Sequence, residues 1–315
     1  MNRVKSKASF FHILSPAEES RLASVDLDAY YNQLQEYIMA RRLTNTTWGA
    51  LTIAPKLKGI TNKIAAKVTK IFSRSDVEVI ADGYENIPSG AVLFAHTHQG
   101  LLDNFAWLPK MPRHCVILHG ADVRKALLLA QLNTGLILVS KAEGKEENRR
   151  NAKLDMIKIL RKGHSIMYYP EGTWNLSPNK LHLPIRYGFL DIAKKAGAPV
   201  VPMVSEFTYD SSQERERITK VHIRFGKPVT VGRTDDLRVK LLEYEERIST
   251  IRWELIEEKG IFPRDSVTYQ EYVNYLKGNI RNLKLGKIDL DKERAGIFGY
   301  EDDFYRFYPI NDLMI

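Results

Sequence analysis

The sequence has few of the residues on which several classes of protein depend. Cys115 is the single cysteine among 315 residues, so an internal disulfide and a cysteine-based zinc cluster are both excluded. Its surroundings, Cys-Val-Ile-Leu, are apolar, which favours a buried small hydrophobic residue over a nucleophile. One cysteine also fits a reducing compartment.

Long apolar segments are missing as well. No stretch with the character of a signal peptide follows the opening Met-Asn-Arg-Val-Lys-Ser-Lys. Nowhere does the chain contain the roughly 18 uncharged apolar residues that a membrane-spanning helix requires. We therefore expect no transmembrane helix, and a protein that is cytoplasmic or bound to a membrane from its cytoplasmic face.

Positive charge, by contrast, is in excess. Lysine and arginine together number 47 against 38 acidic residues, which gives a formal net charge of +9, while 44% of the residues are hydrophobic. The hydrophobic content is typical of a globular protein, and the charge attracts polyanions. Nucleic acid, anionic lipid and phosphate-bearing cofactors all remain open on composition alone.

Residues 1–75 are expected to form a separate helical segment. Apolar and aromatic residues recur at helical spacing over 26–42, and the stretch 48–72 contains five lysines and no acidic residue. A basic amphipathic helix of this kind either lies in a membrane interface or docks on the body with its lysines in solvent. Both interpretations stay open for the helix by itself.

Residues 76–234 change to an alternation of short apolar strands and helical runs. Strands are predicted at 77–81, 91–95, 116–119, 136–139, 165–169, 200–204 and 221–225, and helices at 104–108, 124–132, 145–162 and 187–195. The alternation predicts an α/β domain with helices covering the sheet. Residues 235–315 are expected to be a helical extension, with helices at 235–259 and 267–285 followed by a tail.

The strongest chemical signal is His98 followed by Asp103, directly after a predicted strand. Sites in α/β folds lie at such strand ends. A carboxylate bonded to one ring nitrogen fixes the tautomer of a histidine and makes the other nitrogen a better base, so the pair suits removal of a proton from a hydroxyl. Two alternatives remain open: a metal site built on His96-x-His98, which needs further ligands, and a structural histidine.

Three further segments end strands with notable residues. Gly-Leu-Ile-Leu-Val-Ser-Lys delivers Lys141, Pro-Glu-Gly-Thr forms a turn at residues 170–173, and Val-Val-Pro-Met places a proline within an apolar strand. Glycine in the turn allows close approach of backbone to a ligand. Taken singly, each segment is equally well a surface lysine, a plain turn or a core strand.

Together, and in this order, the four segments resemble those of the glycerolipid acyltransferases, the family of 1-acylglycerol-3-phosphate acyltransferase. The resemblance covers about residues 76–230. It implies a central, mostly parallel sheet flanked by helices. It also implies transfer of a fatty acyl group from acyl-CoA or acyl carrier protein to a hydroxyl of a lysophospholipid, with no permanently bound cofactor and no metal.

The same resemblance assigns roles to individual residues. His98 corresponds to the general base and Asp103 to its orienting partner, and the acceptor oxygen attacks the thioester directly. No Gly-x-Ser-x-Gly nucleophile elbow is present, which agrees with a reaction that forms no acyl-enzyme.

Residues for the acceptor follow from the other motifs. Glu171, Gly172 and Thr173 match the segment that holds the acceptor in the family. Lys141 matches the basic residue that meets the acceptor phosphate, and Arg186 resembles a basic residue that lies two positions before a glycine. The resemblance therefore implies a site with two cations for a phosphate group.

Some positions depart from the family pattern. Thr97 and Gly100 replace the usual asparagine and serine, and Trp174 replaces the arginine that usually follows Pro-Glu-Gly-Thr. Arginine binds phosphate through a planar fork that tryptophan lacks. Acylation of a sugar or cell-envelope acceptor, and a non-catalytic lipid-binding homologue, are therefore alternatives. The implied partners are an anionic membrane surface, to which the stretch 48–72 anchors the protein peripherally, the acyl donor and the acceptor, without nucleic acid.

Overall fold

The computed structural model describes residues 27–43, 77–99, 101–104, 106–120, 135–140, 145–172, 175, 181–210 and 217–259, together with residues 51, 59–60, 62–64 and 66–67. Among the helices in these ranges, none is long and apolar enough to cross a lipid bilayer.

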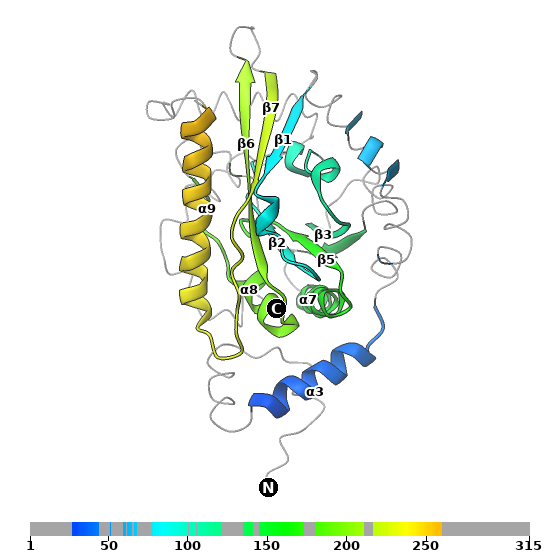
Figure 1. The fold of residues 1–315 in the computed structure, drawn as a ribbon. Helices are drawn as coiled ribbons and strands as arrows, with labels where there is room; N and C mark the ends of the chain where they lie inside the picture. The colour runs from blue at the N-terminus through cyan, green and yellow to red at the C-terminus, as the bar shows by residue number, and fades with distance from the viewer. Residues whose placement is uncertain are drawn as a thin grey trace.

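One seven-stranded sheet forms the centre of the molecule, in the order β1-β7-β6-β2-β5-β3-β4 (Figure 1). The strands β6, β2, β5, β3 and β4 run parallel, whereas β7 is antiparallel to β6 and parallel to β1. This confirms the expected mostly parallel sheet. The bounds are β1 Glu78–Asp82, β2 Leu93–His96, β3 Cys115–Gly120, β4 Leu136–Val139, β5 Ser165–Tyr168, β6 Val200–Asp210 and β7 Arg217–Phe225.

The helices labelled in Figure 1 follow the sequence prediction within about two residues. They are α3 (Leu27–Ala40), α7 (Glu146–Arg161), α8 (Gly188–Ala196) and α9 (Leu237–Lys259). The helices predicted at 124–132 and 267–285 lie outside the described residues, as does most of 48–72, where positions 59–60, 62–64 and 66–67 are helical.

The helix predicted at 104–108 is wrong. The chain there forms two short 3₁₀ helices, η3 (Leu101–Asn104) and η4 (Leu108–Lys110). Pro109 supplies the physical reason, since proline lacks an amide donor and disfavours the α conformation of the residue before it. The segment therefore folds into tight turns, which keep Asp103 next to the end of β2.

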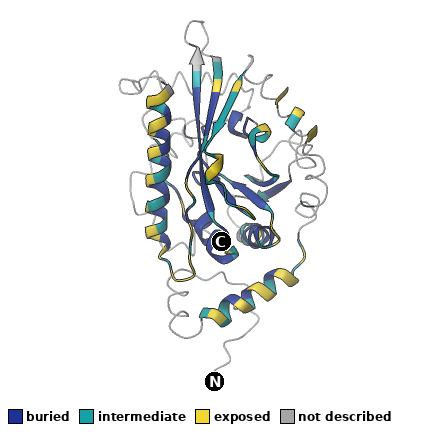
Figure 2. Ribbon diagram, viewed as in Figure 1, coloured by how far each residue is buried: buried dark blue, intermediate teal, exposed yellow. Residues whose placement is uncertain are grey.

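The two faces of the sheet bury separate hydrophobic cores, because successive side chains of a strand point in opposite directions. Leu93 and Ala95 of β2 belong to a core with α7, α8, α9 and α3. Phe94 belongs to the other, which includes Trp107 and Met111 of the segment after η3. Figure 2 shows α9 buried along the side that faces the sheet and exposed along the other.

Helix α3 is attached to α7 by both apolar and polar contacts. Leu34 and Ile38 are buried in the same core as the sheet. Just beyond the helix, Arg41 pairs with Asp155, and the Nζ of Lys158 donates to the carbonyl of Met39 at 2.8 Å. The helices α3 and α9 thus share a core with the α/β sheet, while the domain boundaries at 75/76 and 234/235 stay predictions.

Candidate active site

His98 and Asp103 lie together at the carboxyl end of β2. The Nδ1 of His98 is 3.5 Å from Oδ2 of Asp103, and the two side chains are 12% and 0% exposed. The distance is longer than an ideal hydrogen bond, a common state of catalytic pairs without substrate. With Nδ1 directed at the carboxylate, Nε2 is the ring nitrogen left for a reacting group.

Local backbone contacts hold this turn in shape. The amide of Thr97 donates to the carbonyl of Met203 at 3.0 Å, which extends the pairing of β2 with β6 by one residue. The chain then bends into η3, and the amide of Gln99 donates to Oδ2 of Asp103. The same carboxylate oxygen therefore faces both the imidazole and the backbone of the turn.

Tyr169, directly after β5, forms one wall of the site. Its ring lies 4.2 Å from that of His98 between centroids, at an interplanar angle of 30°. Its hydroxyl donates to the carbonyl of Asp103 at 2.9 Å and accepts the indole N–H of Trp107 at 3.0 Å. The tyrosine thus restrains the imidazole by stacking and anchors the backbone of its carboxylate partner.

Glu171 is buried and joins the site from the turn after β5. Its Oε1 accepts the amide of His98 at 2.8 Å and its Oε2 accepts the amide of Leu183 at 2.7 Å. Burial raises the pKa of Glu171 to about 7, although the two amides and the charge of Arg252 act to lower it. Gly172 follows with a φ of +68°, a left-handed conformation that favours glycine.

The metal alternative finds little support in the geometry around His96. The Nε2 of His96 contacts the Oγ of Ser205, and burial lowers the pKa of His96 to about 4. Within the described residues no group of three histidine, cysteine or acidic side chains gathers to hold a metal ion. His96 is best described as a neutral, buried histidine on the face opposite α9.

The other predicted site residues are placed only in part. Lys141, Thr173 and Trp174 lie outside the described residues. Arg186 is exposed on the segment before α8. Burial raises the pKa of Tyr168 to about 12 while the charge of Arg186 acts to lower it, so this cation lies within electrostatic reach of the end of β5.

Sequence reasoning missed several residues around His98. Tyr169 and Trp107 had a weak signal, because both lie beside recognised motifs and aromatic residues with a polar atom usually bond it when buried. Gln99 had none beyond its position next to His98. Glu206, which accepts a hydrogen bond from Gln99, and Arg252, which pairs with Glu206, had no signal at all.

Comparisons with known proteins agree with the motif pattern. A family model described as Acyltransferase matches residues 78–206. The curated 1-acyl-sn-glycerol-3-phosphate acyltransferase of Cocos nucifera is 24% identical over 168 residues, which cover 50% of this chain and 52% of the relative. The chain thus spans about half the length of that relative.

A solved structure is also similar. The 1-acyl-sn-glycerophosphate (LPA) acyltransferase PlsC from Thermotoga maritima superposes with a TM-score of 0.46 at 20% sequence identity. The alignment covers 76% of this chain and 94% of that one.

Proposed function

We propose that this chain, whose residues 78–206 match the acyltransferase family model, is a glycerolipid acyltransferase. It transfers a fatty acyl group from acyl-CoA or acyl carrier protein to a hydroxyl of a lysophospholipid such as 1-acylglycerol-3-phosphate. The observation that carries the proposal is the buried His98–Asp103 pair at the carboxyl edge of the sheet. A histidine held in this way suits the removal of a proton from an alcohol.

In the proposed reaction, Nε2 of His98 takes the proton of the acceptor hydroxyl while its oxygen attacks the thioester carbonyl. The tetrahedral intermediate collapses with cleavage of the carbon–sulfur bond, and the thiolate receives the proton from the imidazolium. Asp103 stabilises that imidazolium through Nδ1. One proton moves from alcohol to thiol, and no permanently bound cofactor takes part.

Glu171 has a different part in this proposal from the one that its motif implies. Both of its oxygens accept backbone amides, those of His98 and Leu183. We therefore assign it to holding the His98 turn against the 181–185 segment rather than to direct contact with the acceptor. Gly172 is exposed beside it and remains available to approach a substrate.

For the acceptor, a lysophospholipid phosphate is the first choice. Arg186 is exposed near the end of β5, and Lys141 follows β4, whose carboxyl end lies at the same sheet edge as that of β2. A sugar or cell-envelope acceptor is the second candidate, because Trp174 stands where the family usually has a phosphate-binding arginine.

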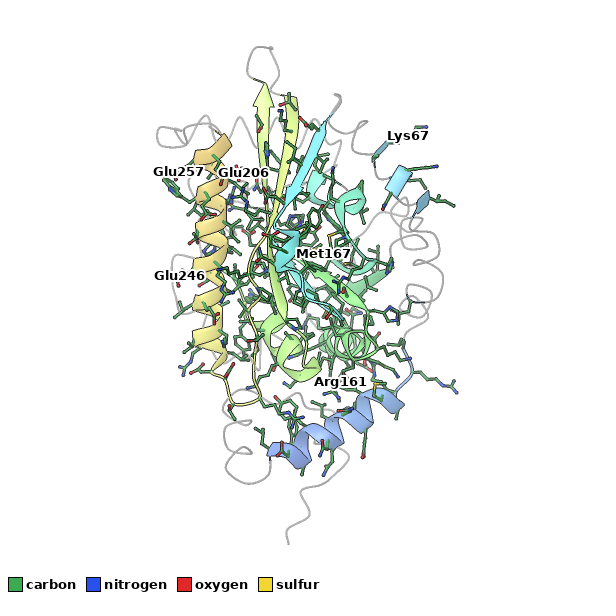
Figure 3. All side chains as sticks on the ribbon, in the orientation of Figure 1. Lys67, Arg161, Met167, Glu206, Glu246 and Glu257 are labelled. Atoms are coloured by element: carbon green, nitrogen blue, oxygen red, sulfur yellow. The ribbon has the colours of Figure 1, made fainter. Side chains whose placement is uncertain are left out.

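Peripheral attachment to the cytoplasmic face of a membrane completes the proposal. Lys63 and Lys67 are exposed in the described part of the stretch 48–72, as are Ile60 and Ile64; Figure 3 labels Lys67. Lysines near anionic lipid contribute about 1 kcal/mol each.

Vesicle flotation tests this attachment. We expect binding to vesicles to require anionic lipid and to weaken as the salt concentration rises. Binding that is independent of salt contradicts an electrostatic anchor.

Thiol release from acyl-CoA, followed with a panel of lysophospholipid, sugar and alcohol acceptors, tests the reaction. We expect turnover with at least one lysophospholipid and a loss of about 10³-fold in His98→Ala, the upper range for a missing general base. His164→Ala is the matched control, because His164 precedes β5 at the opposite edge of the sheet. An active His98→Ala contradicts the mechanism, turnover with sugars alone favours the second acceptor, and no turnover with any acceptor favours a non-catalytic homologue.

A further inference from the structure

A buried ion pair connects α9 to the strand beside the catalytic turn. The Nε of Arg252 on α9 donates to Oε2 of Glu206 on β6 at 2.8 Å, and the two side chains are 1% and 0% exposed. In Figure 3, Glu206 lies on the side of β6 that faces α9, whereas Glu246 and Glu257 lie on the outer side of the helix. Burying two charges costs free energy unless further hydrogen bonds satisfy their remaining donors and acceptors. The other partners of Arg252 and Glu206 therefore decide whether the pair is stable.

On one side the pair reaches the base through Gln99. Oε2 of Glu206 also accepts from the side-chain amide of Gln99 at 3.0 Å, and the same amide donates to the carbonyl of Ser205. Gln99 directly follows His98, and its backbone amide donates to Oδ2 of Asp103. That oxygen is the one facing Nδ1 of His98. Gln99 therefore restrains the positions of both His98, its neighbour in the chain, and Asp103.

On the other side the pair reaches the base through Glu171. A second donor of Arg252, Nη1, binds the carbonyl of Leu181. Two residues further along, the amide of Leu183 donates to Glu171, whose other oxygen accepts the amide of His98. Two chains of contacts therefore start from one guanidinium and meet at His98, one at its backbone amide and the other, through Asp103, at its imidazole.

From this closed ring we infer that Arg252 is a positioning residue for the His98–Asp103 pair, acting from α9 through Glu206 and Gln99 and through Leu181. The inference rests on the proposed function, in which His98 is the base. Arginine suits the task because its planar fork presents several donors in fixed directions, whereas lysine offers a single nitrogen. Helix α9 is by this account part of the machinery that orients the base.

Steady-state kinetics of Arg252→Met and Arg252→Lys test the role. We expect kcat to fall about 10- to 100-fold in Arg252→Met, the effect of displacing a reacting group by about 1 Å, with KM for acyl-CoA changed less than about twofold. Arg252→Lys keeps the charge opposite Glu206 and is expected to recover part of the loss. If Arg252→Lys and Arg252→Met lower kcat equally, the pairing of residue 252 with Glu206 has no role in positioning the base.

Arg247→Met is the matched control on the same helix. Arg247 donates to the carbonyls of Lys227 and Pro228 at 2.8 and 2.7 Å, so it attaches α9 to the body without touching the His98 turn. We expect this variant to lower the melting temperature while kcat stays within about twofold of the wild type. A loss of kcat as large as that of Arg252→Met means that general loosening of α9 explains both variants.

A double-mutant cycle with Gln99→Met separates transmission through Gln99 from an independent effect. If Arg252 acts through Gln99, Arg252→Met adds little to the loss already caused by Gln99→Met; fully multiplicative losses in kcat contradict the inference. Arg252→Met leaves Glu206 as an unpaired buried charge, which can prevent folding. In that case the double variant Arg252→Met/Glu206→Leu, in which both partners are apolar, replaces Arg252→Met in the cycle. The expected result is the same.

Hydrogen–deuterium exchange tests the ring without any turnover. The amides of His98 and Gln99 are both bonded within the ring, so peptides covering residues 96–103 are expected to exchange faster in Arg252→Met and not in Arg247→Met. Unchanged exchange in this segment contradicts the inference even if the enzyme is active. Faster exchange in a protein that turns over no acceptor contradicts the proposed function alone.

Discussion

At the scale of single residues, the orientation of the His98 imidazole depends on three residues from two separate stretches of chain, η3 and the turn after β5. Asp103 faces Nδ1 from the following 3₁₀ helix, Tyr169 stacks on the ring, and Glu171 accepts the backbone amide. Proximity and orientation account for a large part of enzymatic rate enhancement. The residues behind the base should therefore affect kcat more than substrate affinity.

Replacement of Tyr169 by phenylalanine tests this at one atom. The ring stack remains, but the hydroxyl that binds the carbonyl of Asp103 and the indole of Trp107 is lost. A buried donor left without its partner costs about 1–3 kcal/mol. We expect that loss in urea denaturation, together with a fall in kcat of about 3- to 10-fold measured by thiol release.

Tyr168→Phe is the control for the adjacent position. Tyr168 is the last residue of β5 and packs on Phe189 of α8, with ring centroids 5.9 Å apart, on the side of the sheet away from Trp107. We expect kcat to stay within about twofold of the wild type. Equal effects of the two tyrosine variants contradict a specific role for the Tyr169 hydroxyl.

At the scale of elements, a buried charge cluster joins α7 to α8. Asp191 on α8 pairs with Lys195 one turn later and with Lys153 on α7, and all three side chains are buried. Burial alone raises the pKa of Asp191, but the two lysines outweigh it and hold this pKa at about 2. The carboxylate thus stabilises the contact between the helices only while it is ionised.

Asp191→Asn is expected to cost about 3–5 kcal/mol at pH 7, because two buried ammonium groups lose their counter-charge. The folded pKa of about 2 lies below the ordinary value of 3.8, so the wild-type contribution is present above about pH 4 and declines as the pH falls toward 2. The stability difference between the two proteins should therefore shrink over that interval in urea titrations.

Asp236→Asn provides the exposed comparison. Asp236 pairs with Arg238 at the surface, where solvent screens such pairs and they contribute little to stability. We expect a small change in unfolding free energy at pH 7. If the stability difference between the wild type and Asp191→Asn stays constant from pH 5 to pH 2, the pH dependence of stability does not come from Asp191.

At the scale of the whole molecule, helices far apart in sequence share one core with the sheet. Ile38 of α3 and Leu241 and Tyr244 of α9 are buried in the same cluster as Leu93 of β2. The hydroxyl of Tyr244 also donates to the carbonyl of Ala95 at 3.0 Å. The described elements should therefore unfold as a single cooperative unit.

Ile38→Ala tests this cooperativity. Removal of a fully buried isoleucine side chain costs about 2–5 kcal/mol, and we expect the loss to appear as a shift of one urea transition with an unchanged slope. Met39→Ala, at a side chain that is 41% exposed, is the control and should change little. A separate early transition in Ile38→Ala, with the main one unmoved, indicates that α3 folds independently.

Much of the fold and the centre of the site could be predicted from the sequence because the signals are local. Strands and helices follow from hydrophobic periodicity over a few residues. His98 and Asp103 are separated by one turn, and Glu171 belongs to a compact turn motif, so neither needs knowledge of the tertiary fold. Pro109 is an equally local signal, and it accounts for the two short 3₁₀ helices that replace the helix expected at 104–108.

Tertiary structure alone decided which distant segments meet. The strand order brings Glu171 to His98 across 73 positions and Glu206 to Gln99 across 107, and it pairs β7 antiparallel to β6. The residues around Arg252 do not predict a partner on β6, because a charged residue on a helix is usually exposed to solvent. Its pairing depends on how α9 packs, and packing is settled by the whole core rather than by any short stretch of chain.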